Sequence, residues 1–210
     1  MINKKTYLLA AALTFVLISG GFGMNWIINA QREDAIQKSL LNMQSSIAES
    51  QLEMDYLIGF AGGCSLLEEG KKNIAKTLIE TNRKLVQYNE NTIGETEIAR
   101  LKTDQSVLYV KYWMFAIKMK DICKTNVSTI MYFWDISPES QQQGYVLDSI
   151  SEKYGSSALV IPLDYNFDLG IIKILSRQFN VTKAPTIIIN EKTKLEGPVS
   201  SAKIEKYITT

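Results

Sequence analysis

The N-terminal part of the chain begins with a long apolar run. Residues 6–28 carry no charged side chain, and about twenty apolar residues in a helix suffice to cross the hydrocarbon core of a bilayer. Lys4 and Lys5 precede the run, and Trp26 lies where an interfacial aromatic side chain is expected. This pattern predicts a single-pass membrane anchor over 6–28, with residues 1–5 in the cytoplasm and the rest of the chain extracytoplasmic. A cleaved signal peptide and a buried core helix are the alternatives.

Three helical patterns follow within residues 31–124. In each, apolar residues recur at steps of three and four, as on one face of an amphipathic helix. We expect a helical stalk, then a hairpin of two helices over 65–88 and 95–122, and the stalk would permit self-association as a short coiled coil. The stripe residues are Ile36, Leu40, Met43, Ile47, Met54 and Leu57 in the stalk, Leu67, Ile74, Leu78 and Leu85 in the second helix, and Ile98, Leu101, Gln105, Leu108, Tyr112, Phe115, Met119 and Ile122 in the third.

The two cysteines lie at the ends of the predicted hairpin. The turn between its helices centres near residue 93, about 30 residues from Cys64 and about 30 from Cys123. Antiparallel helices would therefore bring both cysteines to the same end, and an exported compartment is oxidising. We predict a Cys64–Cys123 disulfide, which would stabilise the fold by roughly 4 kcal/mol in the chain-entropy model. Two free cysteines with redox or intermolecular roles are the alternative.

The pattern changes after residue 126 to short β-rich runs that alternate with helical ones. The predicted order is strand, helix, strand, helix, two strands and a last helix. A strand–helix–strand unit implies a parallel pair with a right-handed crossover, and the final hairpin adds an antiparallel edge. The predicted strands are 128–134, 158–163, 186–190 and 195–199, and the predicted helices are 141–154, 169–179 and 202–208.

Two local features resemble the thioredoxin fold. An aromatic strand end, Tyr132-Phe-Trp134, leads through a short loop into a helix at the place where that family carries its Cys-x-x-Cys motif. Lys183-Ala-Pro-Thr186 resembles the family's cis-proline segment, and an X-Pro bond adopts the cis form at low cost. The resemblance implies an α/β thioredoxin-like domain over 126–210. The predicted fold class is therefore α+β, with a transmembrane helix, a helical stalk and hairpin, and this domain, similar to membrane-tethered thioredoxin-like proteins of prokaryotes.

The chain departs from the family at the motif itself, because Ser137 and Ser140 stand where the two cysteines are expected. A serine hydroxyl can neither attack a disulfide as a thiolate nor close one. One interpretation is a redox-inactive module that binds an extracytoplasmic protein or peptide partner. The other is a thiol–disulfide oxidoreductase whose two cysteines have been replaced. The predicted partner groove consists of Trp134, Pro138, Glu139, Ala184, Pro185 and Thr186.

Composition narrows the chemistry further. With 23 basic and 22 acidic residues the net charge is +1, which gives no basic stripe for nucleic acid. The chain contains no histidine, which excludes Ser-His-Asp and Cys-His catalysis and histidine-bound metals. Two cysteines cannot build a four-cysteine zinc site. We therefore expect no metal, no cofactor and no nucleic-acid partner.

Overall fold

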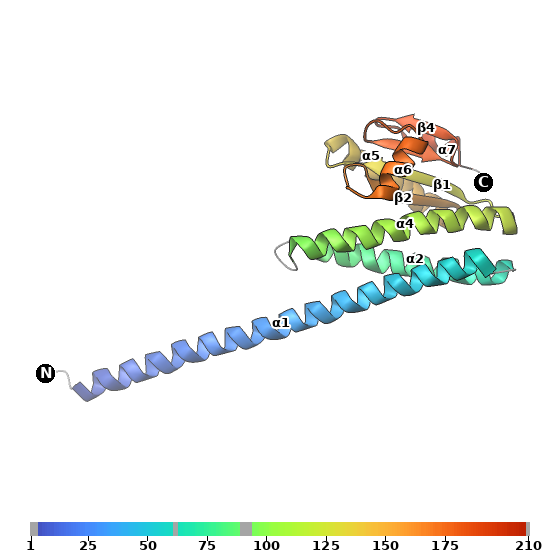
Figure 1. Ribbon diagram of the computed structural model, residues 1–210. Coiled ribbons are helices and arrows are strands. Elements are labelled where there is room, and N and C mark those ends of the chain that lie inside the picture. The colour runs from blue at the N-terminus through green and yellow to red at the C-terminus, as the bar shows by residue number, and fades with distance from the viewer. Residues whose placement is uncertain (1–3, 61–62, 89–93, 209–210) are drawn as a thin grey trace. The chain divides into compact units, whose positions relative to one another are not determined.

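The computed structural model describes the backbone of residues 4–60, 63–88 and 94–208. Side chains are described at residues 14 and 15 and, within those ranges, from residue 31 onward. The chain divides into two compact units, Met1–Ser45 and Ser46–Thr210. The second unit holds the end of the first helix, a helical hairpin and the mixed sheet (Figure 1).

The prediction of a membrane anchor over 6–28 is wrong. These residues begin a single continuous helix, α1 (Lys4–Phe60), of 57 residues. Soon after the apolar run this helix carries the exposed charges of Arg32, Glu33 and Asp34. Across the residues that the structure describes, no helix has an apolar stretch long enough to span a bilayer. The expected fold class with a transmembrane helix and the expected location at the cell membrane are corrected accordingly.

The helical hairpin forms, and most residues of its apolar stripes are buried, although Ile122 is exposed. Its helices are α2 (Cys64–Gln87) and α4 (Glu95–Cys123). The Cys64–Cys123 disulfide joins their ends, with the two Cα atoms 5.5 Å apart, so this prediction is confirmed. The buried stripe residues are Leu67, Ile74 and Leu78 of α2 and Ile98, Leu101, Leu108, Tyr112, Phe115 and Met119 of α4.

The last part of α1 packs tightly on α2. An added Cβ at Gly70 would lie 2.1 Å from Cδ1 of Leu57, so a larger residue here would force the Leu57 side chain to move. Ser50 donates a hydrogen bond of 2.8 Å to the Thr77 hydroxyl across the same contact. Lys111 of α4 also forms a 2.7 Å ion pair with Asp55. The end of α1 and the hairpin therefore form one small helical layer.

A four-stranded mixed sheet follows, in the order β2-β1-β3-β4. β1 pairs with β2 in parallel and with β3 antiparallel, and β3 pairs antiparallel with β4. The element order and the parallel crossover agree with the expectation for a thioredoxin-like domain. The elements are β1 (Ser128–Trp134), α5 (Pro138–Tyr154), the 3-10 turn η1 (Gly155–Ser157), β2 (Ala158–Asp164), α6 (Gly170–Gln178), β3 (Thr186–Ile189), β4 (Thr193–Glu196) and α7 (Ser201–Glu205).

β4 begins and ends earlier than the predicted strand 195–199. Asn190 and Glu191 take positive φ angles of 49° and 57° and form the tight turn after β3, which brings the chain back at once. Gly197, with φ 74°, then ends the strand before Pro198, which has no N–H to give to a ladder. The turn chemistry, more than the apolar residues, sets the limits of this strand.

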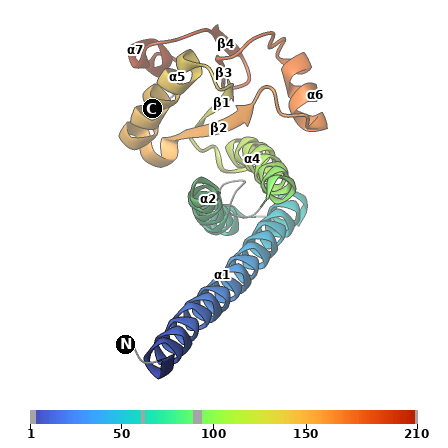
Figure 2. The same ribbon diagram turned by 90° about the vertical axis from the view of Figure 1, so that its left-hand side faces the viewer.

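The sheet is covered on both faces, and α4 takes part in the covering. α5 and α7 cover one face, over a core that includes Ile130, Leu147 and Ile204. On the other face, Phe115 and Met119 of α4 line the same small cavity as Leu159 of β2. Figure 2 shows α4 beneath the sheet, on the side opposite α5 and α7. The hairpin and the sheet therefore share a core within the second unit.

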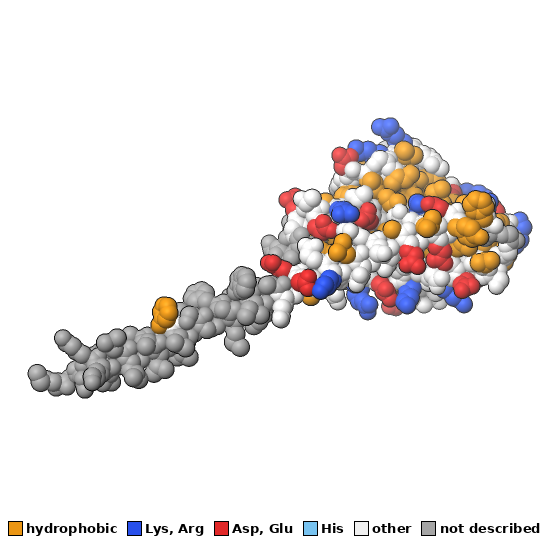
Figure 3. All heavy atoms as spheres, turned by 60° about the horizontal axis from the view of Figure 1, so that its bottom comes forward, with side chains coloured by type: hydrophobic (Ala, Val, Ile, Leu, Met, Phe, Trp, Pro, Cys, Tyr) orange, Lys and Arg blue, Asp and Glu red, His pale blue; other side chains and the backbone are white. Residues whose placement is uncertain are grey.

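The surface of the described residues carries both signs of charge. Acidic and basic side chains are interspersed over the face that Figure 3 shows. Several of them pair locally, as Lys153 does with Glu205 at 2.8 Å and Lys194 with Glu196 at 2.7 Å. This mixture fits the net charge of +1.

Candidate functional site

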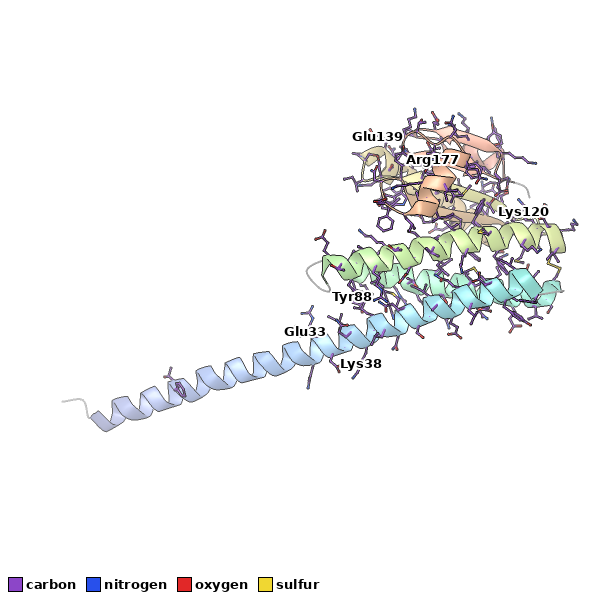
Figure 4. The ribbon with its side chains drawn as sticks, viewed as in Figure 1. Glu33, Lys38, Tyr88, Lys120, Glu139 and Arg177 are labelled. Carbon is purple, nitrogen blue, oxygen red and sulfur yellow. A yellow bond between two sulfur atoms is a disulfide. The ribbon has the colours of Figure 1, made fainter. Side chains whose placement is uncertain are left out.

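The loop after β1 folds around the start of α5. Ser137 is the N-cap residue of α5, and its Oγ accepts a hydrogen bond of 3.2 Å from the backbone N–H of Ser140. Pro138 occupies the first turn of the helix, where its missing N–H costs nothing. Glu139 follows, exposed at the start of α5 (Figure 4), where a negative charge suits the helix dipole. The sequence Ser-Pro-Glu-Ser is thus an efficient helix start.

Both serine hydroxyls are bound to one carboxylate, that of Asp135. Its Oδ1 accepts from the Ser137 hydroxyl and, at 2.7 Å, from the Ser140 hydroxyl. The same oxygen accepts from the Ser137 backbone N–H at 3.1 Å, which closes an Asx turn. Asp135 was not among the predicted site residues, although an aspartate two residues before an N-cap serine is a recognisable signal for this turn.

The hydrogen bonds around Asp135 argue against nucleophilic catalysis. The hydroxyls of Ser137 and then of Ser140 hold the pKa of the Asp135 carboxyl below its usual value. A carboxylate that is this well stabilised is a poor base for a serine hydroxyl, and the chain has no histidine to replace it. Ser140 is also buried, with 2% of its surface exposed. The arrangement fixes the loop, and it offers no activated nucleophile.

Tyr132 ties β1 to the first turn of α5 from below. Its hydroxyl donates a hydrogen bond to the carbonyl oxygen of Ser140. Burial raises the pKa of the Tyr132 phenol to about 12, so it remains a donor across the physiological range. The serine loop is therefore held from two sides, by Asp135 and by Tyr132.

The proline loop lies at the same end of the sheet as the serine loop. Phe133, near the end of β1, pairs with Thr186, the first residue of β3. The Ala184–Pro185 peptide bond is cis, in agreement with the resemblance. The Thr186 hydroxyl donates to the Lys183 carbonyl at 2.8 Å, and the Pro185 carbonyl accepts from the Gly197 N–H at 2.8 Å. These bonds hold the loop in place beside β1.

Ala184 stands out in this loop because its backbone is unused. Neither its N–H nor its carbonyl has a hydrogen-bond partner among the residues that the structure describes. Ala184 is half-buried, whereas Pro185 and Thr186 are buried. An approaching chain could therefore reach the backbone of Ala184 more readily than the side chains beside it.

Trp134 faces a different neighbourhood from the one expected. A cavity of about 370 Å³ beside the serine loop is lined by Trp134, Asp135 and Ser140 together with Asn82 of α2 and Tyr109 of α4. Ala184, Pro185 and Thr186 do not line it. The predicted groove residues thus divide into the helix start, the proline loop, and Trp134 on the side of the helical hairpin. Whether they bind a partner stays a prediction.

The remaining chemistry of the described residues is sparse. Cys64 and Cys123 are joined in the disulfide at the end of the hairpin, outside the serine loop. In the described ranges, no three acidic or cysteine side chains gather closely enough to hold a metal ion.

No protein family model matches the chain, and no curated protein matches it. Among solved structures, the chain is similar to thioredoxin-2 of the malaria parasite, a component of that parasite's protein secretion machinery, with 27% identity over 39% of this chain and 84% of the other, and a TM-score of 0.32. It is also similar to chloroplastic thioredoxin z, with 20% identity over 42% and 81% of the two chains and a TM-score of 0.34. The germline thioredoxin Deadhead of Drosophila melanogaster matches with 16% identity over 46% and 89%, at 0.34. The thioredoxin-like description of this domain rests on its sheet order, crossover and cis-proline.

Proposed function

We propose that the thioredoxin-like domain is a redox-inactive module that binds an extended segment of a partner protein at the proline loop. The observation that carries the proposal is the unused backbone of Ala184, next to Pro185 and at the same end of the sheet as the serine loop. A peptide laid along Ala184 could exchange backbone hydrogen bonds with it, which is how extended peptides add to sheets. The exposed Pro138 and Glu139 would flank such a peptide.

The residues at the helix start support the proposed redox inactivity. Ser137 and Ser140 have no sulfur, and both hydroxyls are engaged with Asp135. The only two cysteines of the sequence are bonded to each other in the hairpin. No thiol remains to attack a substrate disulfide, so binding is the activity that this loop can support.

A peptide selection on the full chain tests the proposal. A library of unstructured peptides is displayed and enriched against the wild-type chain, and the enriched peptides are then measured against Pro185→Ala. We expect saturable binding that Pro185→Ala weakens by at least about tenfold, since the proline ring restricts the backbone beside Ala184. Thr182→Ala, at a neighbouring exposed residue, is the matched control and should bind as the wild type does. Failure to enrich any peptide, or equal binding by Pro185→Ala, would overturn the proposal.

One observation favours a second candidate, a thiol–disulfide oxidoreductase in which both cysteines have been replaced. The Ser137 side chain bonds the Ser140 backbone at the N-terminus of α5, so the two side chains share one helical turn where a thiolate would be stabilised. The double variant Ser137→Cys/Ser140→Cys distinguishes the two. Efficient insulin reduction by this variant would favour the oxidoreductase ancestry, and a folded but inactive variant would exclude it.

A further inference from the structure

The outer edge of β2 is open and forms one wall of a groove. β2 is the first strand in the sheet order, so β1 is its one partner within the described residues. A groove of about 720 Å³ lies between this edge and α2, and Ala158, Leu159 and Val160 all line it. Successive side chains of a strand point to opposite faces, so three consecutive residues can line one groove only along the backbone edge.

The pairing of β2 with β1 indicates which backbone groups face the groove. Tyr165, just after β2, donates its N–H to the Trp134 carbonyl at 2.8 Å. In a parallel ladder the backbone N–H and carbonyl groups of every second residue face the same neighbouring strand. Leu159 therefore faces β1, as Tyr165 does, and Val160 faces the open edge. Pro162, two residues after Val160, also faces the open edge, where a residue without an N–H is tolerated. Val160 thus presents both its N–H and its carbonyl to the groove.

The charged side chains of the groove are mostly basic. Lys71, Lys72 and Arg83 of α2 line it, against the single acidic residue Glu68. None of the three basic side chains forms an ion pair among the described residues. Between these cations and the strand edge the floor is apolar and includes Leu78. The groove therefore combines an unpaired strand edge, an apolar floor and a positive rim.

We propose that this groove binds an extended acidic peptide segment, which adds to the outer edge of β2 as a fifth strand. The backbone of Val160 would supply main-chain hydrogen bonds, and alternate side chains of the peptide would reach the apolar floor and the lysines of α2. The site is separate from the proline loop, and the proposal does not depend on the proposed function. A fatty or aromatic acid could bind the basic side chains and the apolar floor of the groove. Unlike a peptide strand, it would not require a hydrogen bond from the Val160 N–H.

The test uses the full chain and two labelled synthetic peptides of equal length, one alternating valine and glutamate and the other alternating valine and lysine. Fluorescence anisotropy should show saturable binding of the acidic peptide, at least about tenfold tighter than the basic one. Hydrogen exchange of the Val160 amide should slow when the acidic peptide is bound. Equal affinity for both peptides, or an unchanged Val160 amide, would overturn the proposal.

Variants locate the binding. Val160→Pro removes the edge donor and should abolish binding of the acidic peptide. Lys72→Glu should weaken it about tenfold, since reversing one nearby charge is worth that much at a partly screened site. Lys76→Glu, exposed on the same helix but outside the groove, is the matched control and should leave binding unchanged. If Val160→Pro does not fold, the effect of Lys72→Glu still shows whether the acidic peptide binds at this groove. Binding that is insensitive to Lys72→Glu, or that is lost in Pro185→Ala, would assign the peptide elsewhere and overturn the proposal.

Discussion

The indole N–H of Trp113 in α4 donates a hydrogen bond of 3.0 Å to the carboxylate of Glu191, in the turn between β3 and β4. The same carboxylate accepts from the Thr129 hydroxyl in β1, and the Trp113 ring meets Phe179 edge-on at 6.4 Å. Next to it, Lys120 of α4 donates to the Asn190 side chain at 3.2 Å. The helical hairpin is thus hydrogen-bonded to the sheet through the turn between β3 and β4.

This bond predicts that the hairpin and the thioredoxin-like domain unfold together. Trp113→Phe keeps most of the ring but removes the donor, and it should lower the free energy of unfolding by about 1–3 kcal/mol. Urea denaturation, followed by circular dichroism, measures the change. Met114→Ala, at a neighbouring half-exposed residue, should change stability by less than about 1 kcal/mol. Two separate transitions in the wild type would contradict this prediction.

The disulfide should stabilise the hairpin without any catalytic role. Cys64→Ser/Cys123→Ser should lower the free energy of unfolding by about 2–4 kcal/mol, because the loop of the unfolded chain is no longer closed. Dithiothreitol should destabilise the wild type to a similar extent and leave the double variant unchanged. A wild type that is equally stable with and without the reductant would show that the bond is not formed in the folded protein.

Two glycines of the helical layer should respond to alanine in opposite directions. Nothing lies within 4 Å of a Cβ added at Gly59, so Gly59→Ala should stabilise the protein by about 0.5–1 kcal/mol through helix propensity. At Gly70 the added methyl group would collide with the buried Leu57 side chain, so Gly70→Ala should destabilise by about 1–3 kcal/mol. Thermal denaturation of both variants checks the pair, and stabilisation by Gly70→Ala would show that α1 and α2 do not pack here as described.

Asp135 gives a pH-dependent contribution to stability. Its pKa lies below the ordinary value of 3.8, first because of the Ser137 hydroxyl and then because of the Ser140 hydroxyl. A carboxyl with a lower pKa in the folded state stabilises the protein above its unfolded pKa, and this contribution is lost as the pH falls through the folded pKa. Carboxyl NMR titration should place Asp135 below 3.8 in the wild type and nearer that value in Ser137→Ala/Ser140→Ala. Ser149→Ala is the control, and an unchanged pKa in the double variant would contradict the hydrogen-bond assignment.

The parts of the fold that were predicted from sequence are those with strong local signals. The aromatic strand at Tyr132, the Ala184-Pro185 dipeptide and the spacing of the two cysteines each fix a feature that the structure contains. The serine loop was also located, because it follows the aromatic strand end where the thioredoxin family carries its Cys-x-x-Cys motif. The helix after it begins at Pro138, earlier than the predicted range 141–154, because Ser137 caps it.

The features that were missed depend on long-range contacts. The stripe of α4 predicted one buried face, yet Val110, Trp113 and Ala116 bury a second face that helps to cover the sheet. The spacing of apolar residues along one helix does not show how many other elements pack against that helix. The membrane anchor was predicted from residues 6–28 by themselves, whereas α1 continues through charged residues to Phe60.

The most direct test of the account measures disulfide reduction by the wild-type chain, with insulin as the substrate and dithiothreitol as the electron source. Because Ser137 and Ser140 have no thiol, and Cys64 and Cys123 belong to the hairpin and not to the serine loop, we predict a rate equal to that of dithiothreitol alone. The Cys64→Ser/Cys123→Ser variant should give the same rate. The opposite result is a wild-type rate clearly above that of dithiothreitol alone, together with no such excess in the variant. It would place redox chemistry at the hairpin cysteines and contradict a module that acts by binding alone.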